Sequence, residues 1–392
     1  MNNHFTRLDN KLIFIFCILI FTFLTQYVTT DIQRHILSIE RINMGKSHYS
    51  PNFLFSFTVN LFSGFSNNLS SLYSAAIIIL SLATTGKYII SKIIIADLSK
   101  TLNNKYSNKN LSLIALVLFF CFAIPDFYNI FILKWFYLGR IVPTVWHNST
   151  TIFLFPFAIL LFCKQLKVFN RTTIFLFRDI VIINCLVVIN ILIKPSFIFV
   201  FIPGTFFMLL PSFRSDNFQR IMLKLTPILT GGVLSISQYI LIYQIDYFSS
   251  IFGQNGIRIS APFEYFAHYY PRWYIPISFI LSLALPLFSM IAYREIFKYP
   301  PFVYSLYLTI AGILISVFII ETGPRMWHGN FTWQNIICTY LLMLTTITFL
   351  IPKFISRKRN LKTTTFLIVV LGLHSLSGIL YLIKIAITLS YY

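Results

Sequence analysis

The chain has 392 residues, of which 57% are hydrophobic and only 11% are charged. A soluble domain carries about a quarter charged residues, so this composition excludes an ordinary water-soluble surface. The formal net charge is +20, but the basic residues stand in short clusters between apolar runs, which is typical of membrane-protein loops and not of a nucleic-acid-binding face.

Eleven apolar stretches along the chain are long enough to be expected as membrane-spanning helices. They are residues 12–29, 69–90, 110–128, 149–165, 174–193, 196–212, 225–245, 273–293, 301–320, 334–351 and 364–388. We therefore expect an all-α bundle of about 11 spans that forms one integral membrane domain over residues 1–392. No small-residue cleavage site follows the first stretch, which predicts a retained helix.

The positions of Lys and Arg predict the orientation. With the N-terminus inside and the spans alternating, every inner loop is basic, and inner Lys and Arg outnumber outer ones about two to one, as the positive-inside rule requires. Residues 87–109, with five lysines, form the longest basic inner stretch. The expected location is a bacterial inner (plasma) membrane, with a cytoplasmic N-terminus.

Residues 30–68 are expected to form a long outer loop that contains a membrane-surface helix. Within residues 51–65 a polar stripe at helical spacing (Ser56, Asn60, Ser63, then Asn67) lies opposite an aromatic and aliphatic face (Phe53, Phe57, Leu61, Phe65). A helix with two such faces lies in the interface plane. The alternative is a short span inside the bundle, which would invert every later loop.

The first candidate for chemistry is Asp31, just past the first span. A carboxylate there, beside Arg34 and His35 as substrate-binding groups, is placed to act as a general base on a sugar hydroxyl. The plainer alternative is a helix cap or a salt bridge to Arg34. Glu264 is the reserve carboxylate.

Lys194 stands between two apolar stretches, directly before Pro195, which ends the helix and fixes a hairpin. Its ammonium is a candidate to hold a lipid-linked phosphate, although it also suits contact with phospholipid headgroups. Arg140 is a second candidate phosphate ligand, and His147 and Asn148 are candidate substrate-binding residues on the same expected face.

The segment 321–333 is the densest group of polar and aromatic residues on the expected outer face. Arg325 and His328 are candidates to bind phosphate, and the candidate substrate-binding residues are Glu321, Trp327, Asn330 and Trp333. The two tryptophans also suit the interfacial aromatic belt. No metal-ligand spacing such as HExxH occurs, so no metal site is assigned, although a divalent metal is compatible with the scattered His and Asp.

This pattern resembles the GT-C superfamily of polyprenol-dependent membrane glycosyltransferases. The points of resemblance are Asp31 at the start of a long first outer loop, the surface helix at 51–65 and the Lys194-Pro195-Ser196 turn. The segment 321–333, which contains Glu-Thr-Gly-Pro-Arg and then His-Gly-Asn-Phe-Thr-Trp, is similar to loops of membrane proteins of O-antigen or exopolysaccharide assembly. O-antigen polymerases are similar as well.

The resemblance implies an inverting glycosyltransferase that acts on a polyprenyl-(pyro)phosphate-linked sugar or oligosaccharide at the outer face. It also implies contact with membrane lipid and a chain-length regulator or flippase as partners. The alternative is a lipid-linked oligosaccharide flippase or another polytopic transporter, for which paired ionisable residues near the midplane are typical. No such pair is apparent in the sequence.

Overall fold

The computed structural model describes residues 2–102, 106–126, 128–137, 140–169, 176–245, 256–356 and 361–391. Its α-helices are α1 (Asn2–Tyr27), α2 (Asp31–Asn43), α3 (Leu54–Phe62), α4 (Leu69–Thr101), α5 (Asn108–Phe119), α6 (Ser149–Phe169), α7 (Leu176–Ile193), α8 (Ser196–Leu209), α9 (Ser212–Ser215), α10 (Phe218–Tyr243), α12 (Glu264–Tyr269), α13 (Ile275–Ser282), α14 (Ala284–Ala292), α15 (Pro300–Phe318), α16 (Gln334–Ser356) and α17 (Leu361–Thr388). Short turns of helix are η1 (Tyr128–Leu133), η2 (Arg272–Tyr274), η3 (Arg294–Lys298) and η4 (Gly323–His328), and the strands are β1 (Ile257–Ile259) and β2 (Ile319–Glu321).

The structure is an all-α bundle of a multi-pass membrane protein, but it has fewer spans than expected. Among the described residues, seven helices are long and apolar enough to cross a membrane: α1, α4, α6, α10, α15, α16 and α17. The pair η2–α13 and α14 is bent by 68° and makes an eighth if it counts as one broken span. The prediction of eleven spans is therefore wrong.

Three of the expected spans are not among these helices. Residues 110–128 contain only α5, which has 12 residues, and residues 196–212 contain α8, which has 14. The stretch 174–193 contains α7, an 18-residue helix with Asp179 in its first turn. At about 1.5 Å per residue, α5 and α8 are each shorter than the roughly 30 Å of a hydrocarbon core.

Between α5 and α6 the described chain is mostly irregular, and residues 121–123 and 140–148 are buried. Pro125 lies within it, and proline removes a backbone donor and disfavours helix at the preceding residue. Helix α17 supplies the missing hydrogen bonds: Phe122 N donates to the carbonyl of His374 at 2.9 Å, and Ser377 Oγ donates to Ala123 O at 2.6 Å. Irregular backbone at membrane depth is tolerated where protein satisfies it in this way.

Helix α4 runs further than the predicted span and carries lysines that were expected in an inner loop. Lys92 Nζ lies 2.6 Å from Asp9 Oδ2 on α1. Lys87 is also buried, with Nζ 4.0 Å from the ring centroids of both Phe155 and Tyr340. Lys87 and Lys92 therefore lie inside the bundle, whereas Lys100 and Lys109 of the same predicted basic stretch are exposed.

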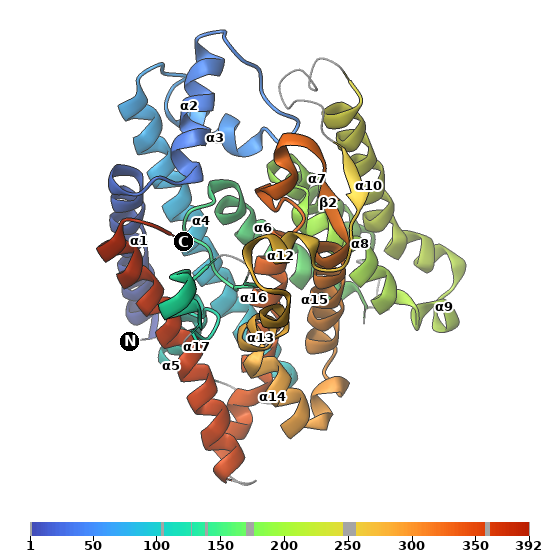
Figure 1. Ribbon diagram of the computed structural model, residues 1–392. Helices are drawn as coiled ribbons and strands as arrows, with labels where there is room; N and C mark the ends of the chain where they lie inside the picture. Colours follow the sequence, from blue (N-terminus) through green and yellow to red (C-terminus); the bar gives the residue numbers. More distant parts are fainter. Residues whose placement is uncertain are drawn as a thin grey trace.

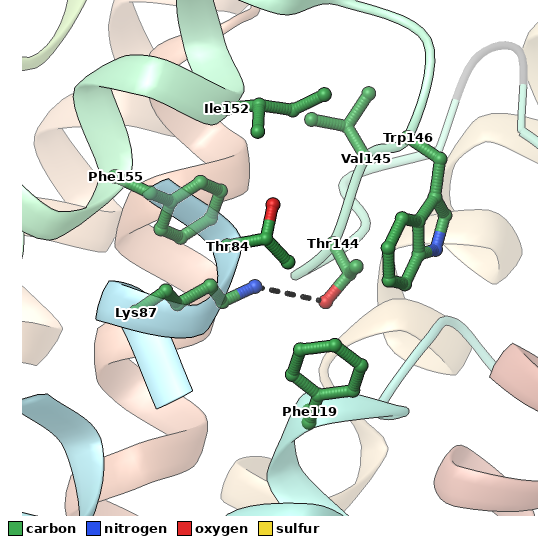
Figure 2. Close-up of a pocket in the computed structure, with 8 residues that line it drawn as sticks. All are labelled: Thr84, Lys87, Phe119, Thr144, Val145, Trp146, Ile152 and Phe155. Carbon is green, nitrogen blue, oxygen red and sulfur yellow. Dashed lines mark hydrogen bonds between the residues drawn. The ribbon is translucent and has the colours of Figure 1, made fainter. Parts of the chain in front are cut away.

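A small cavity lies beside Lys87, and Figure 2 shows its ammonium directed at the hydroxyl of Thr144, 3.3 Å away. The cavity has a volume of about 10 Å³, which leaves room for about one water molecule. No carboxylate in the described part of the chain pairs with Lys87. The Lys87 ammonium instead links α4 to the irregular segment that leads into α6.

The residues between α1 and α4 form two helices at one end of the bundle, near the segment around β2 (Figure 1). At nine residues, α3 is too short to cross a membrane. Its Asn60 is buried, with Nδ2 donating to Asn43 Oδ1 at 2.6 Å, whereas Phe57, Leu61 and Phe62 are exposed. Asn60 of the polar stripe therefore packs inward, whereas Phe57 and Leu61 of the apolar face point outward, as suits a helix in contact with lipid.

Candidate functional site

Lys194 lies in the turn between α7 and α8, and it is the centre of a group of side chains from four separate parts of the chain. Pro195 is the N-cap of α8 and confines the turn to two residues. We define the Lys194 cluster as Asp31, His147, Asn148, Lys194 and Trp333. All five were predicted from the sequence as site residues, and the fold brings them together.

Asn148 joins Lys194 to Asp31. Its Nδ2 donates to Asp31 Oδ2 at 2.7 Å, and its Oδ1 accepts from Lys194 Nζ at 3.1 Å. Oδ1 also accepts from the backbone N–H of Thr151 at 3.0 Å, so Asn148 caps the start of α6. The Thr150 hydroxyl is a third donor to the amide oxygen, at 3.2 Å. Because this oxygen takes three donors and the nitrogen faces a carboxylate, the orientation of the side chain is fixed.

Lys194 makes two further contacts. Its Nζ donates to Thr151 Oγ1 at 2.9 Å and lies 4.3 Å from the ring centroid of Trp333. An ammonium has three donors, and these hydrogen bonds to Asn148 and Thr151 use two of them. Desolvation by the surrounding protein lowers the pKa of Lys194 to about 7, against the opposing field of Asp31.

Asp31 is positioned by local sequence. Thr30 caps α2: its Oγ1 accepts from Ile32 N at 3.2 Å, and its backbone N–H donates to the side chain of Gln33 at 2.9 Å. This capping box places Asp31 in the first helical turn, where the helix dipole favours a carboxylate. Oδ1 of Asp31 makes no hydrogen bond to the residues that the structure describes, and it is the oxygen left for a proton.

His147 is buried beneath Asp31 and Lys194. Its ring stacks on Tyr391 with centroids 3.9 Å apart and meets Tyr137 edge-on at 4.5 Å. Burial lowers the pKa of His147 to about 3, so the imidazole is neutral at physiological pH. His147 therefore contributes shape and packing to the Lys194 cluster, not charge.

A second group of polar residues lies on the other side of Lys194. Glu321, at the end of β2, is almost fully buried, and its Oε1 accepts from Tyr243 Oη at 2.7 Å. Its Oε2 accepts from Asn330 Nδ2 at 2.5 Å, and Arg325 Nε lies 3.6 Å from Oε1. With three such partners Glu321 acts as an anchor that holds Arg325 and Asn330 in place.

These residues line a pocket of about 180 Å³ between α8, α10 and the segment after β2. We call it the Arg325 pocket. Its polar wall contains Asn52, Lys194, Ser196, Ser235, Gln238, Tyr243, Glu321, Arg325 and Asn330, and its apolar wall contains Phe199, Tyr239, Ile242, Ile257 and Phe331. Lys194 belongs to both the cluster and the pocket, whereas Asp31 reaches the pocket only through Asn148.

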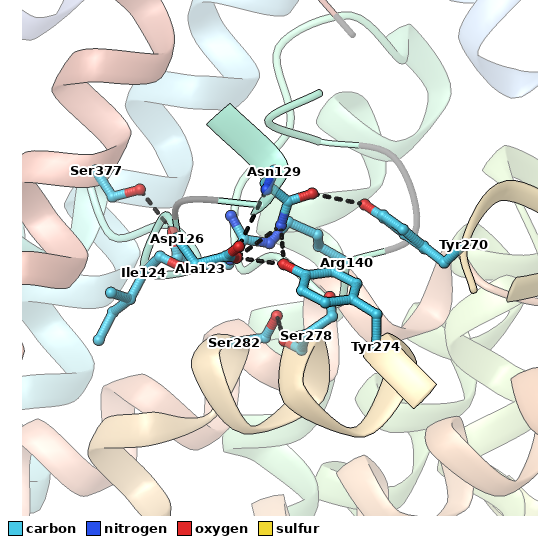
Figure 3. Close-up of polar contacts among 10 residues, drawn as sticks. All are labelled: Ala123, Ile124, Asp126, Asn129, Arg140, Tyr270, Tyr274, Ser278, Ser282 and Ser377. Carbon is cyan, nitrogen blue, oxygen red and sulfur yellow. Dashed lines mark hydrogen bonds and ion pairs between the residues drawn. The ribbon is translucent and has the colours of Figure 1, made fainter. Parts of the chain in front are cut away.

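Arg140 lies apart from both groups, in a buried network between α13 and the irregular segment (Figure 3). Its guanidinium pairs with Asp126 at 3.6 Å and donates to the carbonyl of Ile124. Asn129 Nδ2 donates to the same carboxylate at 2.8 Å, and Tyr274 Oη donates to it as well. Arg140 therefore has a structural role, because it helps to join the irregular segment to the residues around α13.

The remaining predicted residues also lie outside the cluster and the pocket. Glu264 pairs with Arg258. Trp327 stacks on His268 with centroids 4.0 Å apart.

Arg34 and His328 are exposed, and the half-buried His35 meets Phe55 edge-on at 5.9 Å. Burial lowers the pKa of His35 to about 4. Within the described ranges, no group of three His, Cys, Asp or Glu residues could hold a metal ion.

Sequence reasoning missed several residues that complete the two groups. Thr151 accepts from Lys194, and Tyr243 donates to Glu321. Gln238 lines the pocket from the middle of an apolar helix, and a lone amide in such a helix was a signal that could have identified it. Asn52 and Ser235 carry no comparable signal.

Comparison with protein-family models finds no match to this chain, and no curated protein is similar to it. The class that the fold defines is therefore a polytopic membrane protein with seven or eight candidate spans. The resemblance to polyprenol-dependent glycosyltransferases stays a prediction, which rests on Asp31, the helix at 51–65, the Lys194-Pro195-Ser196 turn and the segment 321–333.

Proposed function

We propose that the chain is an integral membrane glycosyltransferase of cell-surface polysaccharide assembly, with a polyprenyl-(pyro)phosphate-linked donor bound at the outer face. The observation that carries the proposal is the position of Lys194. It is hydrogen-bonded through Asn148 to the Asp31 carboxylate and also lines the Arg325 pocket. A base and two cationic groups thus converge from the first outer loop, the α7–α8 turn and the segment after β2.

In the proposed reaction, an acceptor hydroxyl oxygen attacks the anomeric carbon of the donor sugar while the bond from that carbon to the phosphate oxygen breaks. Asp31 Oδ1 takes the proton of the hydroxyl. Lys194 and Arg325 stabilise the negative charge on the departing phosphate, an electrostatic role that gains strength in a partly dehydrated pocket. The configuration at the anomeric carbon is inverted.

Asp31 suits the base role better than Glu321 does. Glu321 accepts hydrogen bonds from Tyr243 and Asn330 and pairs with Arg325. Such contacts occupy the lone pairs that a proton would need. Asp31 accepts one side-chain hydrogen bond, from Asn148, and retains an oxygen for the acceptor.

The surroundings of the pocket suit a lipid-linked substrate. Tyr239 and Ile257 line it and are 39% and 38% exposed, so its rim is apolar and open. Further along α10, Leu229, Val233 and Ile236 are each at least 60% exposed and continue the apolar surface. A prenyl chain on this surface would leave its phosphate beside Lys194 and Arg325.

One observation favours a second candidate, a flippase or other transporter. The Lys92–Asp9 pair and the buried Lys87 are ionisable groups inside the bundle, and such groups commonly mark transport pathways. Neither group lines the Arg325 pocket. A transporter requires the charges within the bundle, whereas a glycosyltransferase requires Asp31 and Arg325.

The test is a polysaccharide-ladder assay in cells that lack the chromosomal gene and carry it on a plasmid. Asp31→Asn and Arg325→Gln are expected to abolish the ladder at normal protein level, because they remove the base and a phosphate-binding cation. Asp97→Asn, which alters an exposed ion pair with Lys100, is the matched control and should retain the ladder. Full activity of both site variants would refute the assignment.

A further inference from the structure

The Arg325 pocket has an uneven distribution of charge and hydrogen-bonding groups. Its ionic groups, Lys194, Arg325 and Glu321, lie at the α7–α8 turn and after β2. The wall formed by α8, α10 and Asn52 is uncharged. An anion satisfies only the charged part, so the neutral wall requires a different kind of partner.

Four residues of the neutral wall each carry a buried side-chain atom that has no hydrogen-bond partner among the residues that the structure describes. The atoms are Asn52 Oδ1, Ser196 Oγ, Ser235 Oγ and Gln238 Oε1. Ser196 is 2% exposed and Gln238 is 7% exposed. Buried polar atoms are nearly always hydrogen-bonded, so four in one wall indicate that a group from outside the protein completes them.

The orientation of the Gln238 side chain shows which hydrogen-bonding atoms a ligand of this wall must have. Its Nε2 donates to the carbonyl of Ile191 at 3.1 Å and faces that of Pro51 at 3.5 Å. This fixes the amide with Oε1 as the unsatisfied acceptor. Both Gln238 Oε1 and Asn52 Oδ1 accept only, so the ligand must bring donors, which a fully ionised phosphate lacks.

The pocket also has the size and the apolar wall for a ring. A cavity of about 150 Å³ holds one benzene molecule, and this pocket measures about 180 Å³. Phe199 and Phe331 stack with centroids 5.7 Å apart and line the pocket. Sugar rings combine such hydroxyl donors with C–H faces that pack on apolar side chains.

We infer that Asn52, Ser196, Ser235 and Gln238 form a subsite that reads the hydroxyl groups of one neutral sugar ring, next to the Lys194 and Arg325 charges. This inference rests on the proposed function and assigns the sugar specificity of the site to the α8–α10 wall. The anion position and the hydroxyl subsite are then separate determinants of binding. Changes in one leave the other intact.

The test measures binding to the purified protein in lipid nanodiscs with two probes that share one lipid. One probe is a 15-carbon prenyl phosphate, and the other is the same lipid phosphate bearing a single hexose, taken in turn as glucose, galactose and mannose. At least one glycosylated probe is expected to bind about tenfold more tightly than the bare phosphate, since each added hydrogen bond contributes modestly.

Ser235→Ala should remove most of that gain and leave the affinity for the bare phosphate unchanged. Ser237→Ala, two residues away on the exposed face of α10, is the matched control and should keep the gain. Gln238→Met is a second test variant that removes the acceptor oxygen. Ser196→Ala supplements it because Gln238 also holds the backbone at Ile191.

The outcomes separate the two proposals. If the bare phosphate binds but no hexose increases the affinity, the subsite is wrong and the anion site stands. If a hexose increases the affinity equally in the wild type and in Ser235→Ala and Ser196→Ala, the subsite is also wrong. If neither probe binds to the wild type, the proposed function itself fails.

Discussion

Replacing Lys194 by methionine tests the link between the Asp31 carboxylate and the pocket. Methionine keeps most of the apolar stem and removes the ammonium. The cap of α6 survives, because Asn148 Oδ1 still accepts from the N–H of Thr151 at 3.0 Å. The substitution therefore removes a positive charge with limited damage to the fold.

The expected loss of affinity and of transfer rate in Lys194→Met follows from the strength of a hydrogen bond made by a charged donor. A hydrogen bond to a charged group contributes about 1.5–3 kcal/mol, so the affinity for prenyl phosphate should fall roughly ten- to hundredfold. Transfer should fall by about a hundred- to a thousandfold, as when one donor to a developing oxyanion is removed. Lys46→Met, at an exposed position between α2 and α3, is the matched control.

The pH dependence of prenyl-phosphate binding is an independent test of the role of the Lys194 ammonium. Because burial lowers the pKa of Lys194 to about 7, the ammonium is largely present below pH 7 and is lost as the pH rises above it. Affinity for prenyl phosphate should decline from pH 6 to pH 8, and binding near pH 8 should take up protons. Titration calorimetry in buffers of different ionisation enthalpy measures both. An unchanged affinity or an unchanged pH profile in Lys194→Met would refute the reasoning.

Three further predictions concern the fold around the site. Asn148→Ser keeps an N-cap for α6 but breaks the bridge to Asp31, so we expect transfer to fall at least tenfold with little change in the thermal midpoint. Gly378→Ala should destabilise the protein by about 1–3 kcal/mol or more, because a Cβ there overlaps a facing backbone carbonyl, whereas Gly372→Ala has open space. Lys92→Met should cost about 1–3 kcal/mol, because it removes the ion pair with the half-buried Asp9 carboxylate, which keeps its hydrogen bond from Tyr88.

The same three predictions have clear contrary outcomes. Asn217→Ser is the control for Asn148→Ser, because Asn217 caps α10 and lies outside the site. Equal transfer activity in the two variants would show that the Asn148 link between Lys194 and Asp31 is not needed. Equal thermal midpoints for the two glycine variants in detergent would contradict the close packing of α17. A Lys92→Met protein as stable as the wild type would show that the Asp9 pair is dispensable.

The sequence identified the residues of the Lys194 cluster as candidates, but it did not show how they are connected. Asp31 and Lys194 are conspicuous because each is a charged residue at the end of an apolar stretch. Their bridge through Asn148 joins positions 117 residues apart in one contact and 46 in the other. Such pairing depends on tertiary packing, which no local pattern encodes.

The number of spans was overestimated for a related reason. The stretch 110–128 is apolar enough to span, but its helix ends at Phe119 and the chain continues as buried irregular backbone. The hydrogen bonds from His374 and Ser377 on α17 that make this possible lie about 250 residues away. Hydropathy reports burial in an apolar environment and does not distinguish lipid from a protein interior.

Purified protein reconstituted in liposomes with a prenyl-phosphate-linked sugar and an acceptor glycan provides the most direct test of the central claim. The measurement is the rate of formation of the glycosidic product, compared between the wild type and Asp31→Asn. The account predicts product of inverted configuration from the wild type and a loss of at least a hundredfold in the variant. Transport of the lipid-linked sugar across the bilayer without any product would contradict it.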